Sequence, residues 1–376
     1  MKKVKLVDIC KIQYGFAFDS SLFSNSNNGM PLIRIRDVVR GFTDTYTSEA
    51  FIEDYVVNKG DLLIGMDGEF NIAEWQSEKA LLNQRVCKLI PSSTVGKRYI
   101  YYSLIKILKQ IEEKTAFVTV KHLSAKELNK VEILLPSLEE QKAIAGKLDK
   151  VSNLIEKRKQ QIKKLDELVK SRFIEMFGDE SKYQSTPLNE SVEEMFIGPF
   201  GSSLKNECFV SKENGYCMVY EQKHAIRKTM DVDTRYVDEK KYTELQRFTI
   251  QAGDIIVSCR GTIGETFVVP NGAPMGIMHP SIMKIRLKES AYNKVFFNHL
   301  LIKVLKQHEA EANGSGIKMA ITATELGKEL FIVPPMNLQQ QFAAFVEQID
   351  KSKFEIQKSL EKLEILKKSL MQQYFG

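Results

Sequence analysis

Two aspartates and two histidines stand at spacings where catalytic or metal chemistry is conceivable. Asp61 and Asp254 each follow a glycine and open an apolar run, GDLLI and GDIIV. Two such carboxylates could share acid–base work, but an aspartate in a turn that leads into a strand is the commoner arrangement. His299 and His308 lie on one predicted helix with no cysteine or carboxylate cluster at metal spacing. We therefore expect no catalytic residue and no metal site.

Nucleotide and cofactor chemistry also lacks its sequence motifs. The chain contains no G-x-x-x-x-G-K-[ST] phosphate loop, no G-x-G-x-x-G and no G-x-S-x-G. It has no Asn/Asp-Pro-Pro-aromatic stretch of the kind found in adenine methyltransferases, because VPPM has other flanking residues. We expect that this chain binds no cofactor itself and is not an enzyme.

Composition limits the class of protein further. The 376 residues are 43% hydrophobic and carry a formal net charge of +6, which is enough apolar material for two ordinary cores. The weak basic bias permits nucleic acid as a partner without requiring it. The five cysteines form no CxxC pair, which favours free thiols in a reducing cytoplasm. No apolar run reaches roughly 18 residues, so we expect no membrane span and no export.

The chain contains an internal repeat. Residues 119–178 align with residues 317–376 without a gap. Upstream the match is looser: GDLLI parallels GDIIV, NQRVCKLI parallels HPSIMKIR, and GFAFDSSL parallels GPFGSSLK. Because the divergence is confined to the N-terminal part of each copy, it indicates two modules that perform different versions of one job. The alternative is a duplication retained only for symmetry.

Each repeat begins with a mixed segment, residues 1–135 and 179–334. Short apolar runs broken by Gly, Pro, Asn and Asp read as strands with turns. Helical patches follow at residues 99–113 and 294–311. The mixture predicts an α+β globular domain in each copy.

Each repeat ends in a long amphipathic segment, residues 136–178 and 335–376. Apolar residues fall there on alternating steps of four and three, the coiled-coil period. Such a helix is a rod of roughly 60 Å. We expect two globular α/β-mixed domains in a pseudo-two-fold repeat, separated by two long antiparallel coiled-coil helices that bury each other's apolar seams. The alternative is that each helix packs only on its own globular domain.

Two glutamines match at the starts of these helices. Gln141 and Gln339 each follow the proline that precedes the helix. They could contact a partner subunit, but a role in satisfying the helix start explains them equally well.

At this point the chain resembles the specificity subunit of type I restriction–modification enzymes. The resemblance covers essentially the whole chain, and its specificity lies in the order of short motifs that occur twice with the helices in place. The motifs are GPFGSSLK (198–205), VYEQKHAI (219–226), the paired GDLLI and GDIIV, GSGIKMAITATEL (314–326), PSLEEQKAIAGKLD (136–149) and PPMNLQQQFAAFVEQID (334–350).

The resemblance implies two target-recognition domains, each reading one half of a bipartite site in double-stranded DNA. It implies that the helices space these domains and dock two methylation subunits, which carry S-adenosylmethionine. Motor-nuclease subunits would carry ATP and Mg²⁺, and the chain itself would be non-catalytic. A two-domain protein-binding adaptor on a coiled-coil rod is the alternative function.

The same resemblance directs attention to side chains that could touch DNA. Bases are read by Arg, Lys, Asn and Gln, and phosphates are held by Lys, Arg, Ser and Thr. In the first domain we expect contacts from Arg34, Arg36, Gln84, Arg85, and Lys121 with His122. In the second domain we expect contacts from Ser202, Ser203, Lys205, Tyr220, Glu221, Gln222, Lys223, Arg260 and Lys318.

Each of these candidates has a structural alternative. Arg34 and Arg36 alternate with isoleucines and could form the solvated face of a strand. Ser202 and Ser203 could simply make a turn. The region 220–222 could be a strand end, and the glycines before Lys318 could only supply loop flexibility.

Overall fold

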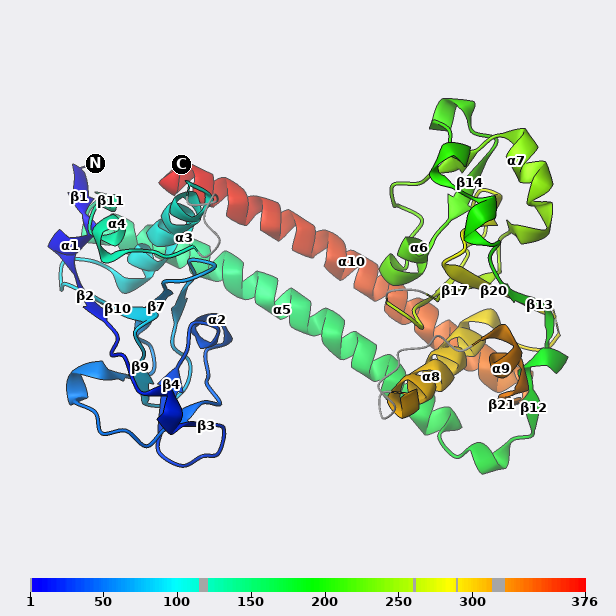
Figure 1. The fold of residues 1–376 in the computed structure, drawn as a ribbon, viewed down its shortest axis with the longest axis horizontal. Coiled ribbons are helices and arrows are strands. Elements are labelled where there is room, and N and C mark those ends of the chain that lie inside the picture. Colours follow the sequence, from blue (N-terminus) through cyan, green and yellow to red (C-terminus); the bar gives the residue numbers. More distant parts are fainter. Residues whose placement is uncertain (1, 115–120, 260–261, 289, 313–321) are drawn as a thin grey trace. The chain divides into compact units, whose positions relative to one another are not determined.

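The computed structural model describes residues 2–114, 121–259, 262–288, 290–312 and 322–376. Its contacts divide the chain into two compact units (Figure 1). Unit 1 comprises Met1–Gln160 and Gln357–Gly376, and unit 2 comprises Gln161–Ile356. Each unit therefore holds one globular domain and a part of both long helices, α5 (Leu138–Phe177) and α10 (Met336–Phe375). Division of the chain at residues 135, 178 and 334 stays a prediction.

Unit 1 contains sheets of four strands (β2-β10-β7-β8), five strands (β3-β5-β4-β9-β6) and two strands (β1-β11). Its strands are β1 (Lys2–Lys5), β2 (Cys10–Tyr14), β3 (Phe23–Ser24), β4 (Met30–Ile33), β5 (Tyr46–Thr47), β6 (Val56–Val57), β7 (Leu62–Gly65), β8 (Ile72–Glu74), β9 (Ala80–Leu82), β10 (Val86–Pro91) and β11 (Glu132–Leu135). Its shorter helices are α1 (Leu6–Ile9), α2 (Asp37–Arg40), α3 (Lys97–Lys114) and α4 (Ala125–Leu128), with 3₁₀ turns at Ser20–Leu22 and Glu53–Tyr55.

Unit 2 contains two four-stranded sheets (β13-β20-β17-β18 and β15-β14-β19-β16) and a two-stranded sheet (β12-β21). Its strands are β12 (Ser185–Pro187), β13 (Val192–Ile197), β14 (Cys217–Tyr220), β15 (Tyr236–Val237), β16 (Thr249–Ile250), β17 (Ile255–Ser258), β18 (Thr266–Val268), β19 (Gly276–Met278), β20 (Ile282–Leu287) and β21 (Leu330–Ile332). Its shorter helices are α6 (Gln222–Arg227), α7 (Glu239–Glu244), α8 (Lys294–Ala312) and α9 (Ala323–Lys328). Its 3₁₀ turns are Glu180–Lys182, Leu188–Glu190, Gly201–Ser203, Asn206–Cys208, Lys212–Asn214 and Gln246–Phe248.

The two units share one strand plan. The order β2-β10-β7-β8 in unit 1 corresponds to β13-β20-β17-β18 in unit 2. Each unit also has one parallel pair, β4 with β9 and β14 with β19, while the other paired strands of the described chain are antiparallel. The repeat therefore extends into the parts where the two sequences have diverged, and the expected α+β class is confirmed.

The matched Gly-Asp pairs are turns. Gly60 and Gly253 adopt positive φ angles of 91° and 88°, which a side chain would strain. The carboxylates of Asp61 and Asp254 accept backbone N–H bonds from the residues three positions earlier, each at 2.9 Å. This is the turn role that the sequence favoured over a catalytic one.

The long helices pack together inside each unit. In unit 1, Ala145 and Leu148 of α5 are buried beside Leu370, Met371 and Phe375 from the end of α10. Further along α5, Lys159 lies 3.6 Å from Glu364, so the later α5 residue meets the earlier α10 residue. The two helices therefore run antiparallel in this unit.

In unit 2 the two helices are again antiparallel, and phenylalanine rings pack between them. Phe173 and Phe177, near the end of α5, are buried against Phe342, near the start of α10, with ring centroids 5.4 Å and 5.8 Å apart. Lys353 donates to Asp166 at 2.7 Å. The alternative in which each helix packs only on its own globular domain is therefore wrong.

The side-chain amides of Gln141 and Gln339 form hydrogen bonds within the chain at both their nitrogen and their oxygen atoms. Each is 1% exposed. Their amide nitrogens donate to the backbone oxygens of Pro136 and Pro334, at 2.9 and 2.8 Å. Their amide oxygens accept from the backbone N–H groups of Gly96 (2.8 Å) and Asn293 (2.9 Å), at the starts of α3 and α8. Because both ends of each amide are bonded internally, these residues tie two helix starts together, as the helix-start interpretation requires.

Candidate nucleic-acid interface

In unit 1 the parallel pair brings the ends of three strands to one side of the domain. Ile33 of β4 pairs with Leu82 of β9, and both strands run in the same direction. Gly65 of β7 pairs with Val86, directly after the turn 83–85. The backbone N–H of Met66 then donates to the oxygen of Arg85 at 2.9 Å. Residues that follow these strands therefore gather at one place, which we call the unit 1 edge: Arg34, Arg36, Asp67, Gln84, Arg85, Lys121 and His122.

Arg34 and Arg36 lie in a turn and not on the face of a strand, because β4 ends at Ile33. The buried carboxylate of Asp37 accepts the Arg34 backbone N–H at 2.9 Å, which stops the strand. The Arg36 guanidinium is 54% exposed and lies 3.7 Å from Asp37 and 3.6 Å from Asp44. The Arg36–Asp44 pair is exposed on both sides and is worth about 0–1 kcal/mol. The buried Asp37 carboxylate keeps a second cation, Arg40, at 3.1 Å, so Arg36 can exchange its partners for another acceptor at little cost.

Gln84 and Arg85 lie in the exposed turn between β9 and β10. The Arg85 guanidinium contacts the Asp67 carboxylate, which also contacts His122. Asp67 thus holds two cationic or polar donors at the edge. Gln84 presents its side chain to solvent beside them.

Lys121 has a partly structural role at the same edge. Its ammonium donates to Glu112 at 3.2 Å, and Glu112 is 6% exposed. Burial raises the pKa of Glu112, but the hydrogen bonds from Lys121 and Lys109 outweigh burial and leave that pKa below its ordinary value. Lys121 therefore neutralises a buried carboxylate as well as facing the edge.

Unit 2 builds the same edge with other side chains. Tyr220 of β14 pairs with Met278 of β19, again in parallel. The turn 279–281 follows β19, and the backbone N–H of Cys259 donates to Ser281 at 2.8 Å, as Met66 does to Arg85 in unit 1. We call the residues after these strands and in the adjoining loop the unit 2 edge: Phe200, Ser202, Ser203, Lys205, Gln222, Lys223 and His279.

Two candidates at this edge are not directly available to DNA in this structure. Lys223 lies 2.7 Å from Glu221, which also contacts Arg235. Burial raises the pKa of Glu221, but the hydrogen bonds and charges of Lys223 and Arg235 lower it by more than burial raises it. The pKa of Glu221 therefore lies below its ordinary value. The Gln222 side-chain oxygen is buried without a hydrogen-bond partner in the described part of the chain. Gln222 therefore has to turn outward before it can read a base.

Tyr220 does not fit the expected DNA contact. Its side chain is 0% exposed, because it is the last residue of a strand buried on both faces. Its hydroxyl donates to the backbone oxygen of Pro274 at 2.6 Å, and burial raises its pKa to about 12. We therefore correct this prediction: Tyr220 is a buried core residue that supports the edge, and its side chain cannot contact a base.

The loop with Ser202, Ser203 and Lys205 is held tightly against the turn 279–281. A Cβ atom on Gly198 would lie 2.3 Å from the backbone oxygen of His279, and the Gly198 N–H donates to Ile282 at 2.9 Å. Ser202 is exposed, and Lys205 lies 4.0 Å from Glu207 with 61% of its side chain exposed. Arg260 and Lys318 lie outside the described residues.

Sequence reasoning missed three members of the edges, Asp67, Phe200 and His279. Asp67 was not expected to matter, although an acid between Arg85 and His122 fixes both. Phe200 was passed over because apolar residues were not considered for base contact, although the Gly-Pro-Phe-Gly order around it is the signal of a constrained loop.

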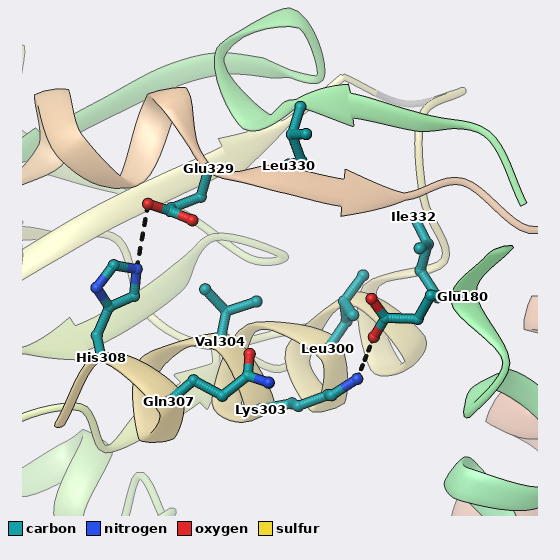
Figure 2. A pocket seen from close by; sticks show the side chains of 9 residues that line it. All are labelled: Glu180, Leu300, Lys303, Val304, Gln307, His308, Glu329, Leu330 and Ile332. Atoms are coloured by element: carbon teal, nitrogen blue, oxygen red, sulfur yellow. Dashed lines mark hydrogen bonds and ion pairs between the residues drawn. The ribbon is translucent and has the colours of Figure 1, made fainter. Parts of the chain in front are cut away.

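A hollow in unit 2 is of another kind (Figure 2). It has a volume of about 210 Å³ between α8 and the residues around β21. His308 lies 3.2 Å from Glu329, and Lys303 contacts Glu180 (Figure 2). Because these charges are already paired across it, the hollow offers little to a small-molecule ligand.

Among the described residues, no three His, Cys, Asp or Glu side chains are grouped so that they could hold a metal ion. Within that same part of the chain, no helix combines the length and apolar character needed to cross a bilayer.

Comparison with known proteins relates this arrangement to one group. The family described as the type I restriction modification DNA specificity domain matches residues 1–165 and 190–367. The type I restriction enzyme EcoBI specificity subunit of Escherichia coli is 44% identical over 169 residues, which are 45% of this chain and 36% of that relative. The MjaVIII specificity subunit of Methanocaldococcus jannaschii is 31% identical over 181 residues, 43% of this chain and 42% of that relative. Both matches thus span less than half the length of the relative.

Solved structures share the fold over the whole chain. The type I restriction-modification S subunit from M. genitalium is 16% identical with a TM-score of 0.59, covering 100% of this chain and 96% of its own. A chain from a type I R-M system, described for its complex assembly and conformational transition, is 14% identical with a TM-score of 0.52 and covers 100% and 97%.

Proposed function

Because this chain belongs to the type I restriction–modification DNA specificity family and is a DNA specificity subunit of such a system, we propose that each of its two edges reads one half of a bipartite target in double-stranded DNA. The observation that carries this proposal is the construction of the edge. One strand plan, with one parallel pair, presents side chains at the same place in both units. The side chains differ, as two readers of different half-sites require.

The residues at each edge suit different parts of the duplex. In unit 1, Arg34, Arg36 and Arg85 can donate to guanine and Gln84 can bond adenine, while Lys121 faces phosphate. In unit 2, Gln222 and Lys223 are the base-reading candidates. Ser202, Ser203 and Lys205 suit phosphate, and we retain Arg260 and Lys318 from the sequence as further contacts.

The long helices are proposed to set the spacing of the half-sites and to dock two methylation subunits. Each helix is continuous over 40 residues. In unit 1, Leu154, Ile365 and Leu366 are 45%, 70% and 46% exposed along the helices. In unit 2, Leu168, Ile174 and Phe354 are 47%, 67% and 58% exposed. A docked partner subunit would cover these apolar side chains.

Chemistry is proposed to come from the partners. The methylation subunits would bind S-adenosylmethionine and methylate adenine at N6, and motor-nuclease subunits would use ATP and Mg²⁺. This chain would contribute recognition alone and be non-catalytic.

Genome-wide mapping of adenine methylation tests this function. Deleting the gene should remove one bipartite motif from the methylated set. Replacing residues 1–135 by the matching domain of a relative should change one half of that motif and keep the other half and the gap. An unchanged set of methylated sites in both strains would favour the protein-binding adaptor instead.

A further inference from the structure

One aromatic side chain at the unit 2 edge has no contact that explains it. Phe200 is 87% exposed, more than any other large apolar side chain in the described residues. Full exposure of a Phe ring forgoes about 1.5–3 kcal/mol of burial. A disordered loop could explain such exposure, but the residues on both sides of Phe200 are held.

The loop is fixed before Phe200 and after it. Pro199 is buried, and Gly198 is pressed on the His279 backbone so closely that a Cβ atom would collide. After Phe200, the Ser203 N–H donates to the Phe200 oxygen at 2.8 Å. Leu204 is then 4% exposed in a cluster with Val219 and Ile277, one residue from each strand of the parallel pair. The backbone therefore holds Phe200 outward from a rigid base.

The residues next to this loop indicate what kind of surface Phe200 would meet. The loop rests on the turn 279–281, directly after β19, while Gln222 and Lys223 directly follow the other strand of the parallel pair. Lys205, five residues further along the loop, adds positive charge. A rigidly presented apolar ring among donors and cations suits a surface that is both apolar and anionic. Stacked bases inside a phosphate backbone have that character.

We propose that Phe200 is a specificity-determining residue that makes the apolar base contact of the half-site read by unit 2. The ring meets a base surface, either the 5-methyl group of a thymine in the major groove or the face of a base at an opened step. This rests on the proposed function, since it requires that the unit 2 edge bind DNA.

The test uses the full chain assembled with the methylation subunits of its own system. Phe200→Ala and Phe200→Leu are compared with Tyr216→Ala. Tyr216 is a 50% exposed aromatic residue of the same unit, directly before β14 and so at the opposite end of that strand from the edge. Binding is measured on duplexes that carry the methylated motif and on a panel with each base pair of both half-sites substituted in turn.

The expected result for Phe200→Ala is about tenfold weaker binding of the motif, the cost of roughly one mismatched base pair. Discrimination should collapse at one position of one half-site and persist at all others. Tyr216→Ala should bind like the unaltered chain. Uracil in place of a thymine at the affected position then separates the two contacts. Loss in the unaltered protein but not in Phe200→Ala indicates the methyl group, and no loss indicates the base face.

Three results would overturn the inference. They are unchanged binding by Phe200→Ala, an even loss on all duplexes, or a loss of assembly with the methylation subunits. In each case the unaltered complex must still prefer its motif. If the unaltered complex shows no preference at all, the proposed function fails and not merely the role of Phe200.

Discussion

The matched loops at the two edges share a backbone device and differ in how they use an aromatic ring. Gly15 in unit 1 and Gly198 in unit 2 both lie where a Cβ atom would strike a backbone oxygen, at 2.1 Å and 2.3 Å. In unit 1, Phe16 packs on Phe18 and Tyr55, with ring centroids 5.0 Å and 5.3 Å apart. In unit 2, Phe200 extends into solvent. The glycine contact that positions the loop is retained, while the aromatic rings that follow it are placed differently in the two units.

The difference also alters the surface next to each edge. Phe16 and Tyr55 line a shallow apolar hollow of about 240 Å³ with Phe51 and Ile52. Unit 1 thus offers a concave apolar surface, whereas unit 2 offers a protruding ring. One strand plan can carry either shape, because the loop is anchored by the parallel pair and not by its tip.

The largest expected effect concerns the helix pairing inside the two units. Phe173→Ala removes a 7% exposed ring that packs on Phe177, Phe296 and Phe342, and should cost about 3–5 kcal/mol. Met371→Ala, at the matching place in unit 1, should cost less because Met371 is only partly buried. Thermal unfolding of both variants measures this. Equal losses would contradict the difference in packing between the units.

A glycine substitution tests the loop device itself. Gly198→Ala should destabilise unit 2 by about 3 kcal/mol, because the methyl group overlaps the His279 backbone and something must shift. Gly201→Ala in the same loop has open space around its Cβ position and no positive φ angle, so it serves as the matched control. Thermal unfolding is again the measurement. If both variants unfold like the unaltered chain, the loop is not held as described.

The pH dependence of stability should differ between the units because of one matched pair of residues. His299 on α8 stands where α3 of unit 1 has Tyr102. Burial, then Lys228 and Lys353, lowers the pKa of His299 from 6.5 to about 4. The unfolded chain therefore binds a proton between these values that the folded chain rejects. Unit 2 should hold this stability above pH 6.5 and lose about 2 kcal/mol, after allowance for screening, as the pH falls toward 4.

The variant His299→Tyr isolates that contribution. His224, also buried in unit 2, has a lowered pKa and contributes in the same direction, so only the difference between the variant and the unaltered chain is diagnostic. The dependence of unfolding temperature on pH should flatten in the variant. An identical dependence would show that His299 titrates normally in the folded protein.

Much of the fold followed from the sequence, and the reason is physical. The seven-residue period of the apolar residues predicts a coiled-coil helix pair. Because the same pattern occurs in both copies of the repeat, each copy strengthens the prediction for the other. Local contacts that leave no pattern in the sequence were harder to predict. The strand that was the alternative interpretation of Arg34 and Arg36 ends before them, because one buried carboxylate, Asp37, accepts the Arg34 N–H. Tyr220 is buried although polar residues follow it, because β14 is covered on both faces.

The edges themselves could be predicted only as a set of residues. Arg34 and Gln84 are far apart in the sequence, and nothing in it shows that β4 and β9 pair in parallel. Once that pairing is present, the residues after both strands must meet. The direction of each side chain, such as the inward amide of Gln222, depends on packing that a single sequence does not encode legibly.

Methylation mapping with edge variants tests the central claim most directly. Arg36→Ala with Gln84→Ala alters only the unit 1 edge, and Gln222→Ala with Lys223→Ala alters only the unit 2 edge. If two independent readers exist, each double variant should relax one half of the methylated motif, a different half in each case, and leave the other half and the gap intact. Relaxation of both halves by one variant, or of neither half by both, would contradict the account.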